Sequence, residues 1–230
     1  MHDNVTRSDA ASPGSPPSKG IKALVPSPLA LLDHRVVVGF HGCEQATADR
    51  VLVTGEPMKP SSNRWDWLGE GIYFWEQDPE RAWQFAEEQR ERGKIANPSV
   101  IGAFIHLGRC FDLTTSTATS ALAAAHAALL VRLAGVGAPV PVNRAGGGGG
   151  GDLLLRDLDC AVLNFHLRDL DDARGLGGPY YQTVRGVFIE GVPAFPGGSI
   201  FTKTHTQVAV RDPAVIVGYF RPSQYTGSGA

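Results

Sequence analysis

Two stretches decide the fold: HRVVVGFHGC (residues 34–43) and DWLGEGIYFWE (residues 66–76). The first is a β-branched run that predicts a buried strand, and the second is an aromatic run entered through a glycine turn. His41 and Gly42 end the first run, where Val or Ile would suit a buried strand better. Because glycine lets a ligand approach the backbone, both residues are candidate ligand contacts. Taken alone, however, a strand-end histidine is more often structural.

The segments next to these stretches carry clear helix signals. Residues 46–56 (ATADRVLVTGE) predict a short helix that ends at Gly55. Residues 76–94 (EQDPERAWQFAEEQRERGK) predict a longer helix with Asp78 as its cap, Pro79 at its first position and Gly93 beyond its end.

The rest of the chain predicts helices and strands that do not alternate regularly. We expect a strand at residues 99–108, an Ala/Leu-rich helix at 118–135 and an amphipathic helix at 153–170. Three short β-branched runs follow and indicate a meander or paired antiparallel strands, at residues 184–191, 204–211 and 214–220. This order favours an α+β fold over a doubly wound parallel sheet.

Composition predicts a single domain. The chain has 230 residues, of which 43% are hydrophobic and 19% charged, enough to bury a sizeable core. We expect a disordered tail at residues 1–20, one domain at 21–222 and a flexible tail at 223–230. The six glycines at 146–151 predict a loop inside that domain.

Charge and cysteine content restrict the partners and the compartment. A net charge of −2 gives no general argument for nucleic acid binding, although a local basic patch remains possible. Three separated cysteines favour a reducing compartment, which we take to be the cytoplasm: Cys43, Cys110 and Cys160. We expect neither a membrane span nor a secretory signal. We also expect no metal, because four histidines lack metal-ligand spacing: His34, His106, His126 and His166.

The ordered combination of these stretches resembles a known family. The chain resembles the catalytic domain of ADP-ribosyltransferases, in the diphtheria-toxin and poly(ADP-ribose) polymerase branch. The resemblance rests on four features in order: His-Gly after a strand, then GEGIYF, then a helix, then VIGAFIHLGRCFDLT. The resemblance covers residues 35–113, and the last strands look like the family's final pair. It implies two small antiparallel or mixed sheets around an NAD cleft, with flanking helices. Residues 115–180 have no counterpart.

The resemblance also implies roles for single residues. His41 would hydrogen-bond the nicotinamide-side ribose of NAD, and the backbone of Gly42 would pair with the nicotinamide carboxamide. Tyr73 would stack on the nicotinamide ring. A second stacking aromatic falls near Gln84, with Phe85 and Trp83 beside it; packing in the core is an equal alternative for these two rings.

The third catalytic position departs from the family pattern. Where the family has a glutamate that begins Glu-x-x-x-x-Asp, this chain has QVAVRD with Gln207. Gln207 would orient the ribose without a charge, or Glu190 would supply the acid from a neighbouring strand, or the domain would only bind NAD or ADP-ribose. His205 lies two residues before Gln207, so it faces either the same pocket or solvent.

The resulting expectation is an NAD-dependent mono-ADP-ribosyltransferase that releases nicotinamide. The alternatives are a silent NAD- or ADP-ribose-binding module and an NAD glycohydrolase. The acceptor, a protein or nucleic acid, stays unidentified, and we expect residues 115–180 to select it.

Overall fold

The computed structural model describes residues 32–146, 153–175 and 177–225. The tail expected at residues 1–20 and most of the glycine loop expected at 146–151 lie outside this part of the chain. So do residues 226–230 of the expected C-terminal tail.

The first diagnostic stretch lies in β1 (Leu32–Glu44), the long strand that opens the described chain. A short helix, α1 (Gln45–Asp49), follows and continues as one π-helical turn, η2 (Arg50–Thr54). Gly55 ends this turn with a φ of 70°, in the left-handed region that glycine adopts without strain. The strand followed by a short helix is therefore confirmed.

The second diagnostic stretch forms β2 (Ile72–Glu76), and α2 (Pro79–Glu91) follows it. The carboxylate of Asp78 accepts a hydrogen bond of 2.9 Å from the backbone N–H of Arg81, which caps the helix. Gly93 lies beyond the other end with a φ of 69°. The predicted cap and stop signals act as expected.

The remaining elements agree with the predicted types but differ at several boundaries. The helix expected at 153–170 begins only at residue 157, so Leu154 and Leu155 lie outside it. Leu155 instead forms an isolated β-bridge with Arg144. The elements are β3 (Pro98–Asp112), α3 (Ser116–Gly135), α4 (Asp157–Arg174), β4 (Thr183–Phe188), β5 (His205–Val210), the 3-10 turn η3 (Pro213–Val215) and β6 (Ile216–Phe220).

The strands form one mixed sheet that closes on itself, which confirms the α+β class. Their order is β1-β2-β5-β4-β3-β6, and an additional pairing of β1 with β3 closes the sheet into a small barrel. Among these pairs only β3 and β4 run parallel. The expectation of two separate sheets is not met, because β3 has 15 residues and pairs with β1, β4 and β6 along its length.

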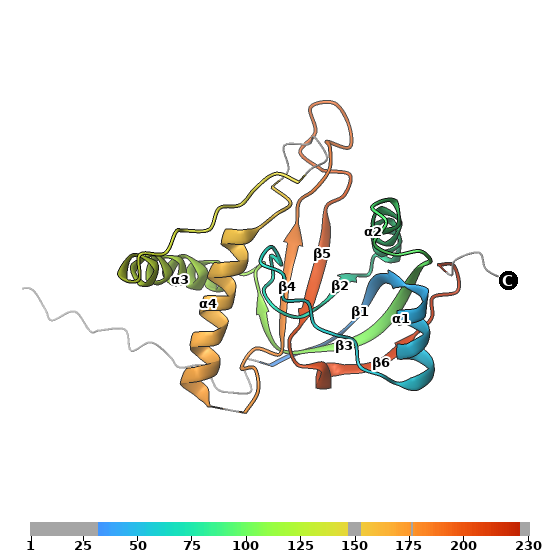
Figure 1. The fold of residues 1–230 in the computed structure, drawn as a ribbon, viewed down its shortest axis with the longest axis horizontal. Coiled ribbons are helices and arrows are strands. Elements are labelled where there is room, and N and C mark those ends of the chain that lie inside the picture. Colours follow the sequence, from blue (N-terminus) through green and yellow to red (C-terminus); the bar gives the residue numbers. More distant parts are fainter. Residues whose placement is uncertain (1–31, 147–152, 176, 226–230) are drawn as a thin grey trace, which may run out of the picture.

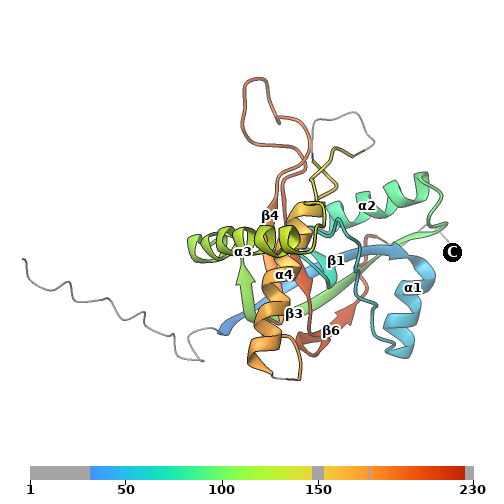
Figure 2. The same ribbon diagram turned by 60° about the vertical axis from the view of Figure 1, so that its left-hand side comes forward.

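The helices lie at different ends of this sheet (Figures 1 and 2). α3 and α4 lie together at one end, and α1 lies at the other, in both views. By length and composition α3 could cross a membrane, contrary to the expectation that no segment could. Such a composition also fits a helix that packs on one side, as α3 does on α4 through Ala125 and Leu129.

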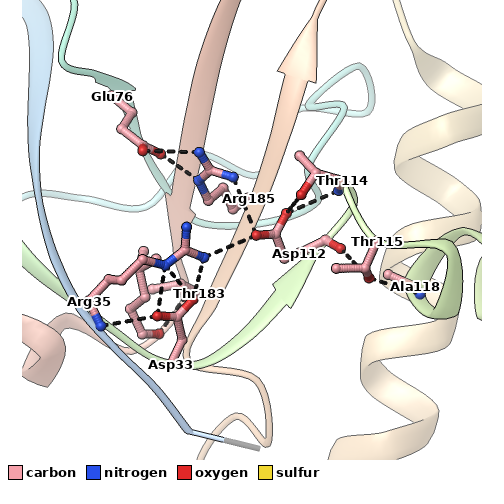
Figure 3. A network of polar contacts seen from close by, with 10 residues as sticks. Asp33, Arg35, Glu76, Asp112, Thr114, Thr115, Ala118, Thr183 and Arg185 are labelled. Carbon is pink, nitrogen blue, oxygen red and sulfur yellow. Dashed lines mark hydrogen bonds and ion pairs between the residues drawn. The ribbon is translucent and has the colours of Figure 1, made fainter.

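A chain of charged side chains joins four strands (Figure 3). Arg185 of β4 pairs with Glu76 of β2 at 2.6 Å and with Asp112 of β3 at 3.3 Å. Arg35 of β1 pairs with Asp33 and Asp112. Burial alone would raise the pKa of Asp112, but the hydrogen bonds from Thr114 and the charge of Arg185 outweigh it and lower this pKa.

Candidate functional site

One cleft of about 500 Å³ brings six of the seven predicted site residues together. They come from β1, β2, α2, β5 and the segment after β4, so the fold joins parts of the chain up to 166 residues apart (41 to 207). The six are His41, Tyr73, Phe85, Glu190, His205 and Gln207.

Strand alternation and register explain this convergence. Side chains two apart on a strand share a face, so Tyr73 and Trp75 of β2 share one, as do His205 and Gln207 of β5. Trp75 is the direct cross-strand partner of Gln207. On the other side of β5, His205 pairs with Phe188 of β4, another residue of the cleft. Glu76 points to the opposite face, where it binds the charged chain described above.

His41 lies where β1 and β2 separate. The ladder between these strands has two residue pairs and ends at Phe40 and Trp75. Beyond this last pair the His41 ring connects β1 to β2, with Nδ1 at 2.7 Å from the carbonyl oxygen of Tyr73. A carbonyl only accepts, so Nδ1 donates and Nε2 is the acceptor of the neutral ring. Burial lowers the pKa of His41, which keeps the ring neutral near pH 7.

Gly42 is not among the residues that line the cleft. A Cβ atom at this position would lie 2.1 Å from the backbone oxygen of Ala82 in α2. The structure therefore accounts for this glycine by the close approach of α2 to β1. The contact between its backbone and a ligand stays a prediction.

The hydroxyl of Tyr73 both donates and accepts a hydrogen bond, and these two bonds fix the side chain. The hydroxyl donates to the Gly69 carbonyl at 2.8 Å and accepts from the Leu68 N–H at 2.9 Å. Burial raises the pKa of Tyr73 well above its usual value, so the hydroxyl stays protonated. The ring thus lines the cleft in one orientation while its tip holds the glycine turn.

Gln207 is held by a tryptophan of the same turn. Its side-chain oxygen accepts a hydrogen bond of 2.6 Å from Nε1 of Trp67. The Trp67 ring also packs edge-on against Phe188, with centroids 5.1 Å apart. Trp67 therefore anchors Gln207 while it lines the cleft, and Trp65 also lines the cleft, with 40% of its surface exposed. The amide nitrogen of Gln207 is left as the group available to a ligand.

Glu190 enters the cleft two residues beyond the end of β4 and is ion-paired there. Its carboxylate lies 3.0 Å from Nη2 of Arg81, a residue of α2. Both side chains are largely buried, with 12% and 7% exposed. The Arg81 guanidinium also lies over the Trp75 ring, 5.7 Å from its centroid. The cleft therefore holds a carboxylate whose charge is already compensated.

His205 belongs to the pocket and is not a surface histidine. Its ring stacks on Phe188 at 5.6 Å, with an angle of 21° between the planes. Nδ1 donates to the Lys203 carbonyl at 2.7 Å, which leaves Nε2 as the acceptor. Burial is the largest influence on the pKa of His205 and lowers it. The cleft thus contains a second neutral imidazole.

Of the three residues considered for the second stacking position, Phe85 lines the cleft and Gln84 and Trp83 do not. Its ring packs 5.0 Å from that of Trp75. Gln84 points to Glu80 on the outside of α2, and Trp83 lies beside Tyr225 at 6.2 Å. Neither lines the cleft.

Sequence reasoning missed several cleft residues. Leu154 and Leu155 line it because the chain before α4 is extended, whereas their apolar pattern predicted a helix. Arg81 was not singled out, since one arginine on a helix gives no local signal of a buried ion pair. Three further cations line the cleft: Lys59, Arg92 and Lys94.

A larger hollow of about 820 Å³ lies beside α4 and shares Asn63 with the cleft. None of the predicted site residues lines it. Within the described residues, no group of three or more His, Cys, Asp and Glu side chains lies close enough to hold a metal ion. The smaller cleft therefore remains the candidate site.

Comparison with known proteins adds no assignment. No family model, no curated protein and no solved structure matches this chain significantly. The function must therefore be argued from the cleft itself.

Proposed function

We propose that this protein is a mono-ADP-ribosyltransferase that uses NAD as donor and releases nicotinamide. The observation that carries the proposal is the meeting of His41, Tyr73 and Gln207 in one cleft. These residues come from the three separated segments on which the resemblance rests. The fold of that family is part of the proposal.

The character of the cleft fits a dinucleotide. Its volume of about 500 Å³ lies within the range of about 300–1,000 Å³ typical of small-molecule sites. The rings of Tyr73 and Phe85 line the cleft and offer faces on which a flat heterocycle can stack. Lys59 and Lys94 at the lining suit the negative charge of a diphosphate.

Three buried donors of the cleft wall also favour a ligand rich in acceptors. Nε1 of Trp75 and both Nε and Nη1 of Arg81 have no hydrogen-bond partner within the described part of the chain. Leaving a buried donor unpaired costs roughly 1–3 kcal/mol, so such groups need an explanation. Ribose and phosphate oxygens would relieve this cost if the wall adjusts around the bound donor.

The proposed reaction breaks the bond between the ribose anomeric carbon and the nicotinamide nitrogen. Nicotinamide leaves with the bonding electrons, and a nucleophile of the acceptor bonds to the anomeric carbon and loses its proton. The transition state resembles an oxocarbenium ion, as in glycoside hydrolysis. Stacking on Tyr73 holds the leaving ring, and Nε2 of His41 accepts a hydrogen bond from a ribose hydroxyl.

In the proposed reaction Gln207 and Glu190 together take the roles of the glutamate that the family has at position 207. The amide nitrogen of Gln207 donates to the ribose, because its oxygen is engaged by Trp67. Glu190 supplies the negative charge of the cleft, weakened by its pairing with Arg81. This arrangement suits transfer of a single unit.

A silent NAD-binding module is the second candidate. The observation that favours it is the pairing of Glu190 with Arg81, which leaves no uncompensated carboxylate at this point of the cleft. Both candidates predict NAD binding, and only the transferase predicts nicotinamide release.

The test measures NAD binding and nicotinamide release on the same samples. Wild-type protein should release nicotinamide, and His41→Ala should abolish the release. Gln207→Ala and Glu190→Gln then show which residue carries the third role. Attachment of ADP-ribose to macromolecules, read by mass spectrometry, separates transfer from hydrolysis. NAD binding without nicotinamide release in buffer or any lysate would establish the silent module instead.

A further inference from the structure

The glycine turn, residues 66–71, orients two groups of the candidate site. Nε1 of Trp67 donates a hydrogen bond of 2.6 Å to the side-chain oxygen of Gln207. The backbone of the turn also donates to and accepts from the hydroxyl of Tyr73, at 2.9 and 2.8 Å. The orientations of the Tyr73 ring and of the Gln207 amide therefore depend on where this turn lies.

The side chain of Asn164, a residue of α4, holds the backbone of this turn. The backbone N–H of Glu70 donates a hydrogen bond of 3.0 Å to Oδ1 of Asn164. A Cβ atom at Gly69 would lie 2.7 Å from the same oxygen. Gly69 has a φ of 77°, in the left-handed region that glycine adopts without strain. The turn is therefore shaped so that Oδ1 of Asn164 can approach its backbone closely.

Asn164 is itself held in one orientation. Its Nδ2 donates to Sγ of Cys160, one helical turn earlier in α4, at 3.3 Å. The Cys160 thiol donates in turn to the carbonyl oxygen of Asn63 at 3.5 Å. Burial raises the pKa of Cys160 to about 11, so the thiol keeps the proton that it donates. Both ends of the Asn164 amide are thus engaged, and its oxygen faces the turn.

Two other contacts between α4 and the turn define its position less sharply. Leu68 packs with Leu163 in a buried cluster, and apolar packing is not directional. The side chains of the Arg168–Glu70 ion pair are 62% and 46% exposed, and exposed pairs contribute little. The hydrogen bond to Asn164 is therefore the directional contact.

Asparagine is also an unusual choice for the middle of a helix. Its side chain competes for backbone hydrogen bonds, which makes it a poorer helix former than alanine or leucine. Asn164 nevertheless lies near the middle of the 18-residue α4. Its bond to the glycine turn explains why an amide occupies this place.

We propose that Asn164 is a positioning residue for the ADP-ribosyl transfer. The hydrogen bond that it accepts from Glu70 sets the glycine turn, and the turn sets the Tyr73 ring and the Gln207 amide. Asn164 lines the larger hollow and not the cleft, so it acts without touching the donor. This role rests on the proposed function. It also gives part of residues 115–180, which have no counterpart in the family, a share in the geometry of the cleft.

The test compares Asn164→Ala, which removes the acceptor, with Asn164→Asp, which keeps it. Arg168, four residues later on the same face of α4, balances the charge that the aspartate adds. Asn143→Ala is the matched control. Oδ1 of Asn143 accepts from the backbone N–H groups of Leu158 and Asp159 at 2.9 and 3.3 Å, so its loss also weakens α4 but not its bond to the turn.

Two measurements are made on each full-length protein. Nicotinamide release over a range of NAD concentrations gives kcat and KM, and kcat is divided by the number of NAD-binding sites counted by calorimetry. This correction removes any loss that comes from unfolded protein alone. Amide hydrogen exchange at Glu70, followed by NMR, reports the hydrogen bond without reference to activity.

We expect Asn164→Ala to lose about tenfold in kcat per site while KM stays within about threefold of wild type, because the loss is one of orientation. Glu70 is exposed, so its freed N–H can turn to water, and its exchange should rise about tenfold. Asn164→Asp should recover both values to within about threefold of wild type, as expected for a retained acceptor. Asn143→Ala should match wild type in kcat per site and in exchange at Glu70.

Three results would overturn the inference and leave the proposed function standing. The first is equal kcat per site in Asn164→Ala and Asn143→Ala. The second is unchanged exchange at Glu70 in Asn164→Ala. The third is an Asn164→Asp protein as impaired as Asn164→Ala, which would show that the acceptor oxygen is not what matters. Absence of nicotinamide release from wild type, in buffer and in lysate, would overturn the proposed function and the inference together.

Discussion

Restoring a carboxylate at position 207 tests the chemistry of the cleft most directly. In Gln207→Glu the new side chain can still accept the hydrogen bond that Trp67 now gives to Gln207 at 2.6 Å. A carboxylate about 4 Å from the developing cation is worth roughly 4 kcal/mol at an effective dielectric of 20, or about a thousandfold in rate.

Burial opposes part of this gain. Gln207 is only 8% exposed, so a charge at this position loses most of its hydration. If about 1.4 kcal/mol remains after that loss, the rate still rises about tenfold. We therefore expect nicotinamide release by Gln207→Glu to exceed wild type by between about ten- and a thousandfold, together with a lower thermal stability.

The assay is nicotinamide release at saturating NAD, with near-ultraviolet circular dichroism to show that the fold is retained. Gln84→Glu is the control, because it adds the same charge to α2 outside the cleft. A folded Gln207→Glu protein with no more activity than this control would refute the placement of position 207 beneath the ribose.

Three other predictions concern stability and pH. Gly42→Ala should destabilise the protein by about 1–3 kcal/mol in urea unfolding, because α2 leaves no room for a Cβ; equal stability of Gly42→Ala and Gly135→Ala, whose Cβ meets open space, would contradict this. Arg185→Met should cost about 3–5 kcal/mol by leaving the largely buried Glu76 without a cation, while Asp112 keeps Arg35; the exposed Arg50→Met should cost under about 1 kcal/mol, and similar losses would show the network to be unimportant. The lowered pKa of His41 means that the unfolded chain binds its proton first as pH falls, so stability is lost below about pH 6.5. The loss between pH 7 and pH 5 should shrink in His41→Gln, and an unchanged loss would contradict the neutral ring.

Local signals in the sequence identified most elements because their causes are local. Asp78 caps α2 through an atom three residues away, and Gly55 and Gly93 end helices by their own backbone conformation. The period of two in β5 placed His205 and Gln207 on one face in advance. These features depend on neighbours along the chain, and a sequence displays such neighbours directly.

The features that were missed depend on contacts between distant residues. Closure of the sheet depends on β3 pairing with three strands, and its apolar run looks the same with one partner or three. The bond between Trp67 and Gln207 joins positions 140 residues apart, and the pair of Arg81 and Glu190 joins positions 109 apart. No periodicity encodes such pairs. Leu154 and Leu155 fit a helical pattern, yet in the structure they precede α4 and line the cleft.

The electrostatics of the cleft explain why position 207 matters so much. His41 and His205 are neutral, Gln207 carries no charge, and Arg81 compensates Glu190. During the proposed reaction positive charge moves from the nicotinamide ring to the ribose. Because these side chains together add no net charge, they stabilise the starting and transition states about equally and bind the donor without accelerating its cleavage. The other cations of the lining, Lys59, Arg92 and Lys94, suit the diphosphate. Only negative potential placed nearer the ribose than the ring favours the transition state. The proposed catalysis therefore requires Glu190, whose charge Arg81 partly offsets, to lie nearer the ribose than the nicotinamide ring.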